Sequence, residues 1–315
     1  MRLASLAEGR DGRLVVARGD RLAAAPVPTL RAALDDWDAA LPLLGAARPG
    51  DVPAGAALMA PLPRAADFLD GSAYVNHVEL VRRARGADMP ERFWTDPLMY
   101  QGTAQFAAPD APIPARPDWG ADCEAEVGVI VGDVPMGAAP DEAAAAIRLI
   151  VLLDDVSLRG LIPDELSKGF GFVHGKPPCA MSPFALTPDE LPGWDGRVLS
   201  GTVAVDVNGA PLGRVEAGEG MVFDFGQLIA HAAATRPLGA GTVIGSGTVS
   251  NPGADGPGRP VAEGGRGYTC LAEQRTVETL LHGRPATRFL SPGDRVSIRM
   301  EGAPFGTIEQ EVRAA

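Results

Sequence analysis

The chain has 315 residues, a formal net charge of −12 and an apolar content of 46%, which is ordinary for a folded protein. A chain this acidic is repelled by phosphate backbones and anionic lipids, so we expect neither a nucleic acid nor a membrane as its partner. Its three cysteines, Cys123, Cys179 and Cys270, are too scattered for a disulfide framework or a zinc motif. With no apolar segment behind a basic start, these features predict a soluble, cytoplasmic protein.

The first 60 residues are predicted to form a small N-terminal domain, and residues 61–315 a larger one. Asp11-Gly12 lies between short apolar runs and predicts a hairpin turn. Thr29 can cap a helix that runs to about Leu44, and a Gly- and Pro-rich link follows over residues 49–63.

A helix is predicted from about Asp70 to Gly86, which would place Asp70 and His77 two turns apart on one face. Taken alone, an Asp at a helix start is better explained as an N-cap, and the His as a surface residue. Tyr100 follows in a segment interrupted by Pro and Gly, where a core position and a rim position fit equally well.

The stretch from Asp122 to Val131 predicts a strand, because its Val and Ile residues favour a pleated backbone. Side chains alternate along a strand, so Glu124 and Glu126 point to one side and the apolar residues to the other. Two neighbouring carboxylates repel each other unless a cation lies between them, and their oxygens suit Mg²⁺, Ca²⁺ or Mn²⁺. A solvated strand face is the commoner reason for such a pair.

A second buried strand over residues 149–153 is followed by Asp155, and a carboxylate there must be paired or bind a metal if it is buried. Arg159 is either the ion-pair partner of Asp155 or a substrate ligand. Lys176 lies in a Gly-rich loop. Because Lys176 and Lys168 are the only lysines among 28 basic residues, a lysine can mark a place that needs a compact ammonium group.

The remaining segments predict a hairpin around Asn208-Gly209, a helix over residues 223–234, a strand over residues 268–277 that contains Glu273, and a last strand over residues 295–300. A Gly-rich turn near Thr248 offers N–H groups and a hydroxyl to an anion but lacks the lysine of a phosphate-binding loop. Strands outnumber helices without βαβ order, so the predicted fold class is α+β and β-rich.

The order and spacing of five motifs resemble the fumarylacetoacetate hydrolase family: Glu124-Ala125-Glu126, Asp155-Val156-Ser157-Leu158-Arg159, Gly175-Lys176, Gly245-Ser246-Gly247-Thr248 and Pro292-Gly293-Asp294. The resemblance covers the chain from about residue 60 to its end, and the interval from Asp70 to His77 is similar to that of the fumarylacetoacetase branch. It implies a mixed β-sandwich roll as the C-terminal domain.

The resemblance also implies the site and its chemistry. The ion, Mg²⁺ or Ca²⁺ with Mn²⁺ as a further option, is expected on four carboxylates: Asp70, Glu124, Glu126 and Asp155. The catalytic residues would be His77 as general base, Glu273 as its orienting partner, and Lys176. The substrate would be held by Tyr100, Arg159 and Thr248.

The implied activity is hydrolysis of the C–C bond of a 1,3-diketone acid, such as fumarylacetoacetate or an acylpyruvate, by a homodimer. The alternatives are a 2-oxo acid decarboxylase, hydratase or isomerase with the same cation, and a binding module without catalysis. Two departures bear on the substrate. Ile162 stands where the family's fumarylacetoacetases carry glutamine, and Arg82, Arg83 and Arg85 compete for the place of a substrate arginine.

Overall fold

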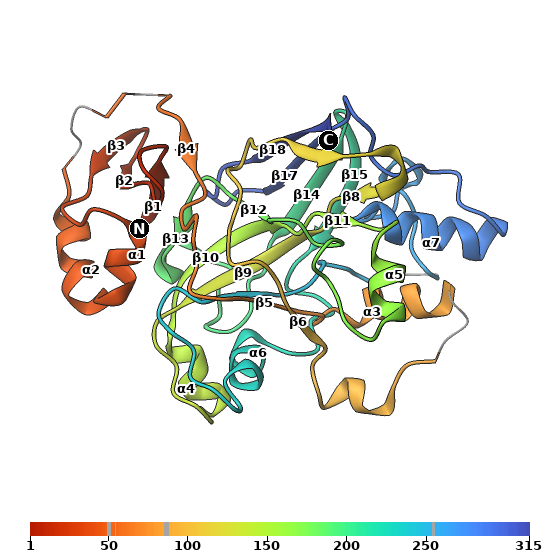
Figure 1. The fold of residues 1–315 in the computed structure, drawn as a ribbon, viewed down its shortest axis with the longest axis horizontal. Coiled ribbons are helices and arrows are strands. Elements are labelled where there is room, and N and C mark those ends of the chain that lie inside the picture. The colour runs from red at the N-terminus through yellow and green to blue at the C-terminus, as the bar shows by residue number, and fades with distance from the viewer. Residues whose placement is uncertain (49–51, 54, 85–87, 254–255) are drawn as a thin grey trace.

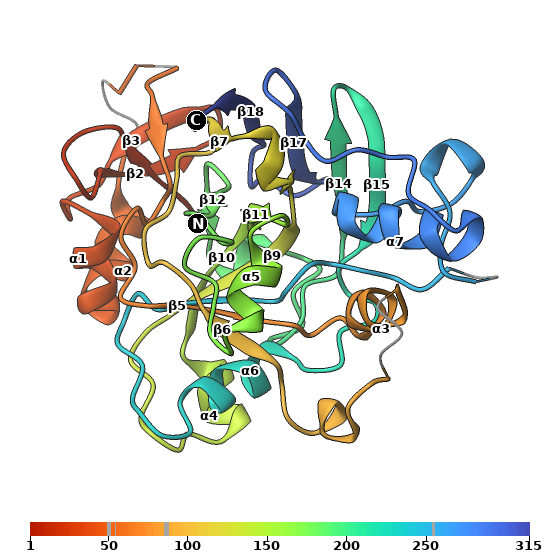
Figure 2. The same cartoon turned by 45° about the vertical axis from the view of Figure 1, so that its right-hand side comes forward.

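A computed structural model describes residues 1–48, 52–53, 55–84, 88–253 and 256–315 (Figure 1). In Figure 1 the N-terminal strands and helices lie at one side of the molecule, the long strands run through its centre, and α3, α5 and α7 lie at the opposite side; in Figure 2 α5 lies near the middle of the view. None of the helices in the described ranges has the length and the apolar run that a membrane span requires.

A long sheet carries the strands in the order β3-β2-β1-β13-β10-β9-β16-β5-β6, with β12 paired to β10 and β4 paired to β1. Its strands are β1 (Arg2–Leu6), β2 (Arg13–Arg18), β3 (Arg21–Ala24), β4 (Leu58–Met59), β5 (Phe68–Gly71), β6 (Met99–Gln101), β9 (Ala125–Val131), β10 (Ile147–Asp154), β12 (Ala180–Met181), β13 (Ala185–Leu186) and β16 (Val243–Gly245).

A second sheet has the order β15-β14-β17-β18-β7, and β11 pairs with β8. These strands are β7 (Ile113–Ala115), β8 (Ala121–Asp122), β11 (Ser157–Leu158), β14 (Thr202–Val207), β15 (Ala210–Glu216), β17 (Arg295–Met300) and β18 (Ile308–Ala314). The α-helices are α1 (Leu30–Asp35), α2 (Trp37–Ala46), α3 (Val75–Ala84), α4 (Pro140–Ala145), α5 (Ile162–Ser167), α6 (Phe225–Ala232) and α7 (Leu271–His282). The fold is therefore the predicted β-rich α+β class, with mixed sheets.

The first 60 residues extend the long sheet, because β1 pairs with β13 through Arg2 and Leu3. Leu3 and Leu14 lie in the same buried cluster as Ile130 and Leu149 of the central strands. The N-terminal segment therefore shares a core with the rest of the chain. The predicted link starts within residues 49–51, which lie outside the described residues.

Strands β9 and β10 form the centre of the molecule and are almost wholly buried. The predicted alternation in β9 is confirmed, since Val127, Val129 and Val131 enter one core while Ile130 enters the other. The two strands are antiparallel, with Glu126 opposite Leu153. Near-continuous burial on both faces explains why their sequences are apolar runs with carboxylates only near the ends.

Two predicted elements are wrong. Asp70 does not begin a helix but lies in strand β5, because tertiary pairing with β6 and β16 on both sides overrides local propensity. Helix α3 begins only at Val75, and its predicted end at Gly86 lies outside the described residues. The segment predicted as a strand over residues 268–277 is mostly helix α7, whose first turn Cys270 caps by accepting the Glu273 N–H.

Smaller features follow the sequence more closely. Thr29 caps α1 as predicted, although a second cap at Asp36 divides the expected helix into α1 and α2. The Asn208-Gly209 turn is confirmed, and both residues have the positive φ that such a hairpin needs.

Candidate active site

Three carboxylates meet where β5, β16, β9 and β10 lie side by side. Asp70 lies on β5, Glu126 on β9 and Asp155 directly after β10, and one oxygen of each lies within 4.8 Å of the others. Strand β16 runs between β5 and β9 and contributes Gly245 to this point. A Cβ on Gly245 would lie 2.2 Å from Asp70 Oδ1 and 3.0 Å from Glu126 Oε2, so only glycine leaves room for both carboxylates.

Burial and mutual repulsion disfavour the ionised forms of these carboxylates, and a bound cation would offset both effects. Burial, with the charge of Asp155 next in effect, raises the pKa of Asp70 to about 8. Burial and then the neighbouring Asp70 raise the pKa of Glu126 well above its usual range. Neither oxygen of Glu126 has a hydrogen-bond partner among the described residues. Since a buried carboxylate without a partner is costly, the three side chains fit a divalent cation with oxygen ligands.

Glu124 lies beside this cluster and is held by two cations. Lys176 Nζ donates to Glu124 Oε2 and to Asp155 Oδ2, and Arg159 Nη2 donates to Glu124 Oε1 at 2.6 Å. Burial alone would raise the pKa of Glu124, but Arg159 and Lys176 lower it well below its usual range. Of the two alternatives for Arg159, the ion pair with Asp155 is wrong, because Arg159 binds Asp122 and Glu124 instead.

Lys176 lies between two carboxylates, a place that suits the compact ammonium group of a lysine. It is buried, whereas Lys168 is exposed. Burial disfavours the Lys176 ammonium, but Asp155 and Glu124 outweigh that effect, so its pKa is raised. Its Nζ also lies 5.4 Å from the centre of the Tyr100 ring, and the Tyr100 hydroxyl donates to both oxygens of Asp155 at 2.9 and 2.8 Å.

His77 is not an ordinary surface histidine. It lies on α3, its side chain is 17% exposed, and its Nδ1 lies 2.7 Å from Glu273 Oε1 on α7. Because a carboxylate accepts hydrogen bonds, the proton of a neutral ring belongs on Nδ1, which leaves the lone pair on Nε2. His77 Nε2 lies 4.0 Å from Glu124 Oε1, so this nitrogen faces the carboxylate cluster.

Sequence reasoning missed two buried acids that support the site. Asp122 accepts the backbone N–H groups of Leu271 and Ala272 at 2.7 and 2.9 Å and also binds Arg159, so it ties the start of α7 to the cluster. Asp154 Oδ1 accepts the Glu124 N–H at 2.9 Å, and burial raises the pKa of Asp154 well above its usual range. The alternation of β-strand side chains offered a signal for Asp122, which lies two residues before Glu124.

A cavity of about 520 Å³ opens onto these groups. Its lining includes seven of the predicted site residues: Asp70, His77, Tyr100, Glu124, Arg159, Lys176 and Thr248. Glu126, Asp155 and Glu273 are almost fully buried and contact these residues, so all ten predicted site residues gather at one place.

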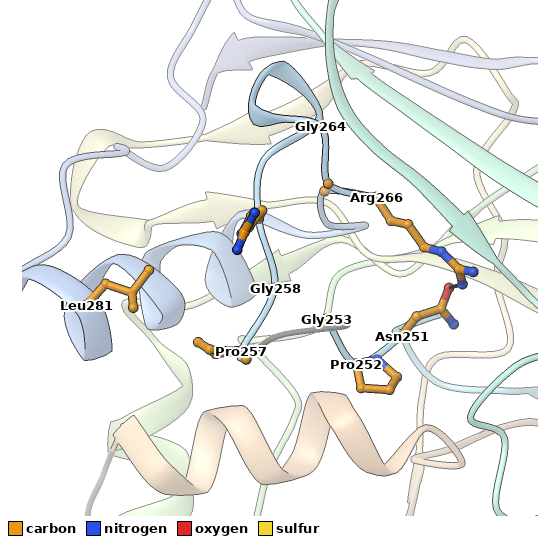
Figure 3. A pocket seen from close by; sticks show the side chains of 12 residues that line it. Asn251, Pro252, Gly253, Pro257, Gly258, Gly264, Arg266 and Leu281 are labelled. Atoms are coloured by element: carbon orange, nitrogen blue, oxygen red, sulfur yellow. Dashed lines mark hydrogen bonds between the residues drawn. The ribbon is translucent and has the colours of Figure 1, made fainter.

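A second pocket of about 420 Å³ has Leu281 of α7 on one side (Figure 3). Its other side is the glycine-rich segment that comes after Ser250. The described residues that line it include none of the predicted site residues. The guanidinium of Arg266 at its edge already binds Glu219 and Asn251.

Two family models match the chain. One is described as the C-terminal domain of fumarylacetoacetate hydrolase and covers residues 68–313. The other is described as fumarylacetoacetase N-terminal domain 2 and covers residues 1–64. No match was found among curated proteins.

Several solved structures share the fold over the whole chain. Fumarylacetoacetate hydrolase from Exiguobacterium antarcticum is 18% identical, with a TM-score of 0.68 and full coverage of both chains. Maleylpyruvate hydrolase from Sphingobium sp. SYK-6, in complex with manganese(II) and pyruvate, is 18% identical with a TM-score of 0.65 and full coverage. A 5-carboxymethyl-2-hydroxymuconate delta-isomerase from Mycobacterium smegmatis is 23% identical, with a TM-score of 0.62. The match covers 100% of this chain and 99% of the isomerase.

Proposed function

Since the chain belongs to the fumarylacetoacetate hydrolase family, we propose that it is a metal-dependent hydrolase that cleaves the C–C bond of a 1,3-diketone acid. One observation carries this proposal beyond the family level. His77 and Glu273 form a hydrogen-bonded pair beside the cluster of Asp70, Glu126 and Asp155. A paired imidazole of this kind can take a proton from water, which is the nucleophile that hydrolysis needs and that isomerisation or decarboxylation of a 2-oxo acid does not.

The divalent cation would be held by Asp70, Glu126 and Asp155, with Glu124 as a fourth carboxylate beside them. Bound there, it would act as a Lewis acid toward the two oxygens of the diketone. Manganese accompanies pyruvate in the structure of the maleylpyruvate hydrolase, and Mg²⁺ and Ca²⁺ suit the same oxygen ligands.

The remaining chemistry belongs to side chains of the protein. His77 Nε2 removes a proton from water while the water oxygen bonds to one carbonyl carbon of the substrate. Glu273 holds the ring and stabilises the imidazolium that forms, as the third member of a catalytic triad does. The Lys176 ammonium lies close enough to the cluster to stabilise the oxyanion of the tetrahedral intermediate.

The C–C bond then breaks, and its electron pair stays on the departing carbon as an enolate. The imidazolium of His77 returns the proton, so the products are a carboxylic acid and a ketone or keto acid. Tyr100, Arg159 and Thr248 line the cavity around this point and are proposed to hold the keto-acid end of the substrate.

Turnover of acylpyruvates with Mn²⁺ or Mg²⁺ tests the proposal, with loss of the enol absorbance as the assay and product identification by NMR. We expect His77→Ala to lower kcat by about 10²–10⁴-fold, because general-base catalysis contributes that much. The variant should still bind the cation in calorimetry, since His77 is not one of its proposed ligands. Unchanged turnover in His77→Ala would remove the assignment of the base.

A second reaction class is supported by the likeness to the delta-isomerase. Isomerisation, hydration or decarboxylation of a 2-oxo acid uses the same cation and enolate but no hydrolytic water. Oxaloacetate and unsaturated 2-oxo dicarboxylates should therefore be assayed beside the acylpyruvates. Turnover of these compounds alone, with no hydrolysis of the acylpyruvates, would replace hydrolysis by this class.

A further inference from the structure

The residues that line the catalytic cavity fall into a polar set, here called the polar wall, and an apolar set, here called the apolar wall. The polar wall carries the carboxylates, Lys176 and Arg159. The apolar wall comes mainly from α3 and α5 and consists of Val78, Val81, Leu98, Ile162, Leu166 and Phe172. Figure 1 shows α3 and α5 on the side away from the N-terminal strands, and Figure 2 separates them, with α5 near the middle of the view and α3 to its right.

The apolar wall is built by helical spacing and by a loop. Ile162 and Leu166 lie four residues apart and therefore share one face of α5. Phe172, from the loop that leads to Lys176, packs edge-on against Tyr100 with ring centres 5.1 Å apart. The wall therefore begins directly beside the residue that binds Asp155.

Part of this wall is exposed to solvent. Leu166 is 45% exposed and Leu98 is 40% exposed. Apolar side chains gathered at the mouth of a cavity mark a place where a ligand covers them.

The buried cations of the cavity are not available to a second carboxylate on the substrate. Among the described residues that line it, Lys176 and Arg159 are already bound to acids of the polar wall. Arg82, in the last turn of α3, donates from Nη1 to the Asp88 carbonyl oxygen and is a partly exposed cation rather than a buried one. A substrate carboxylate placed against Ile162 and Phe172 would lose its hydration, and no buried cation there would pair with it. Burying an unpaired carboxylate costs free energy.

We propose that the apolar wall binds the acyl end of the substrate and that this end is an uncharged hydrocarbon chain or ring. The inference rests on the proposed function, because the keto-acid end is placed at the carboxylate cluster. It names the class of substrate as acylpyruvates or related diketone acids with an apolar acyl group of several carbons.

A chain-length series tests the proposal directly. The value of kcat/KM is measured with Mn²⁺ for acetylpyruvate, butyrylpyruvate, hexanoylpyruvate and benzoylpyruvate, and for succinylpyruvate as the acyl group with a terminal carboxylate. Each methylene that is fully buried should raise kcat/KM about fourfold, so hexanoylpyruvate should exceed acetylpyruvate on the order of 10²-fold. A flat series, or succinylpyruvate as the best substrate, overturns the proposal.

Variants of the apolar wall test whether its side chains cause the preference for long acyl groups. Ile162→Gln and Leu166→Ser should each lower the ratio of hexanoylpyruvate to acetylpyruvate turnover by about tenfold, because each places a polar group in the apolar wall. Leu43→Ser on α2 is the matched control, since Leu43 is 50% exposed and lies outside the cavity, and it should leave the ratio unchanged. An unchanged ratio in both wall variants would place the acyl group elsewhere. If Arg82→Met abolishes a preference for succinylpyruvate, Arg82 binds a substrate carboxylate and the proposal is wrong.

A binding measurement separates this inference from the proposed reaction. The affinities of 2-oxobutyrate and 2-oxooctanoate are compared by calorimetry in the presence of Mn²⁺, which requires no turnover. Affinity that rises with chain length in the wild type but not in Leu166→Ser supports the apolar subsite even where no acylpyruvate is hydrolysed, and only the reaction class then fails. Equal affinities overturn the subsite even where hydrolysis proceeds.

Discussion

The cluster of Asp70, Glu126 and Asp155 predicts that a divalent cation stabilises the folded protein and that Glu126→Gln removes this effect. Glu126 is the most informative position, because it is fully buried and neither of its oxygens has a hydrogen-bond partner among the described residues. Its replacement by glutamine keeps the shape of the side chain and removes the charge that attracts the cation.

The magnitude follows from mass action. A cation at a hundredfold excess over its dissociation constant stabilises the folded state by about 2.7 kcal/mol. For a chain of 315 residues, with an unfolding entropy of about 2.1 cal/mol/K per residue, that corresponds to a rise in Tm of roughly 4 °C. Without the cation, Glu126→Gln should be at least as stable as the wild type, because it replaces a buried acid that has no partner by a neutral amide.

The dependence on pH gives a second signature. The unfolded chain loses the Asp70 proton near pH 4, about the usual pKa of an Asp, whereas the folded chain keeps it up to about pH 8. Between these values the folded state binds more protons, so the stability of the cation-free protein falls as the pH rises, and the loss is complete above about pH 8. A bound cation favours the ionised carboxylates and should reverse this trend.

The assay is thermal unfolding of the chelator-treated protein at pH 5, 6, 7 and 8, with and without Mn²⁺ or Mg²⁺. Glu142→Gln is the control, because Glu142 is exposed on α4 and should retain the full shift in Tm. A wild type whose Tm does not respond to either cation at pH 8 would refute the cation site. An equal response in Glu126→Gln would refute its ligand set.

Three further predictions concern single residues. Glu273→Gln should lower kcat by about 10²-fold while the cation still binds, because the amide no longer stabilises the imidazolium of His77; steady-state kinetics check this, and unchanged kcat would contradict it. Asp294→Asn should cost about 1–2 kcal/mol of unfolding free energy at pH 7, because the Arg288 hydrogen bonds hold the pKa of Asp294 at about 2. That stabilisation is present above about pH 4 and is lost as the pH falls toward about 2, so in denaturant unfolding the variant and the wild type should converge at low pH. Thr29→Ala should cost about 1 kcal/mol at any pH, because it removes the cap of α1; a loss below the error of the unfolding curve would show that the cap is dispensable.

The sequence determined the features that depend on neighbours along the chain. The apolar runs of β9 and β10, the Asn208-Gly209 hairpin, the cap at Thr29 and the β-rich class were all readable from local pattern, because strand alternation and turn chemistry act over a few residues. The ordered motifs also indicated the family and the site residues, although each motif alone was weak.

Only the tertiary structure decided how those residues act. Asp70 is in a strand because β6 and β16 flank it, Glu273 is on a helix whose start is held by Asp122, and Arg159 binds Asp122 and Glu124 rather than Asp155. The apolar wall likewise joins side chains from distant segments. Such facts follow from which surfaces the packed sheets bring together, and no local propensity encodes a contact between residues that lie far apart along the chain.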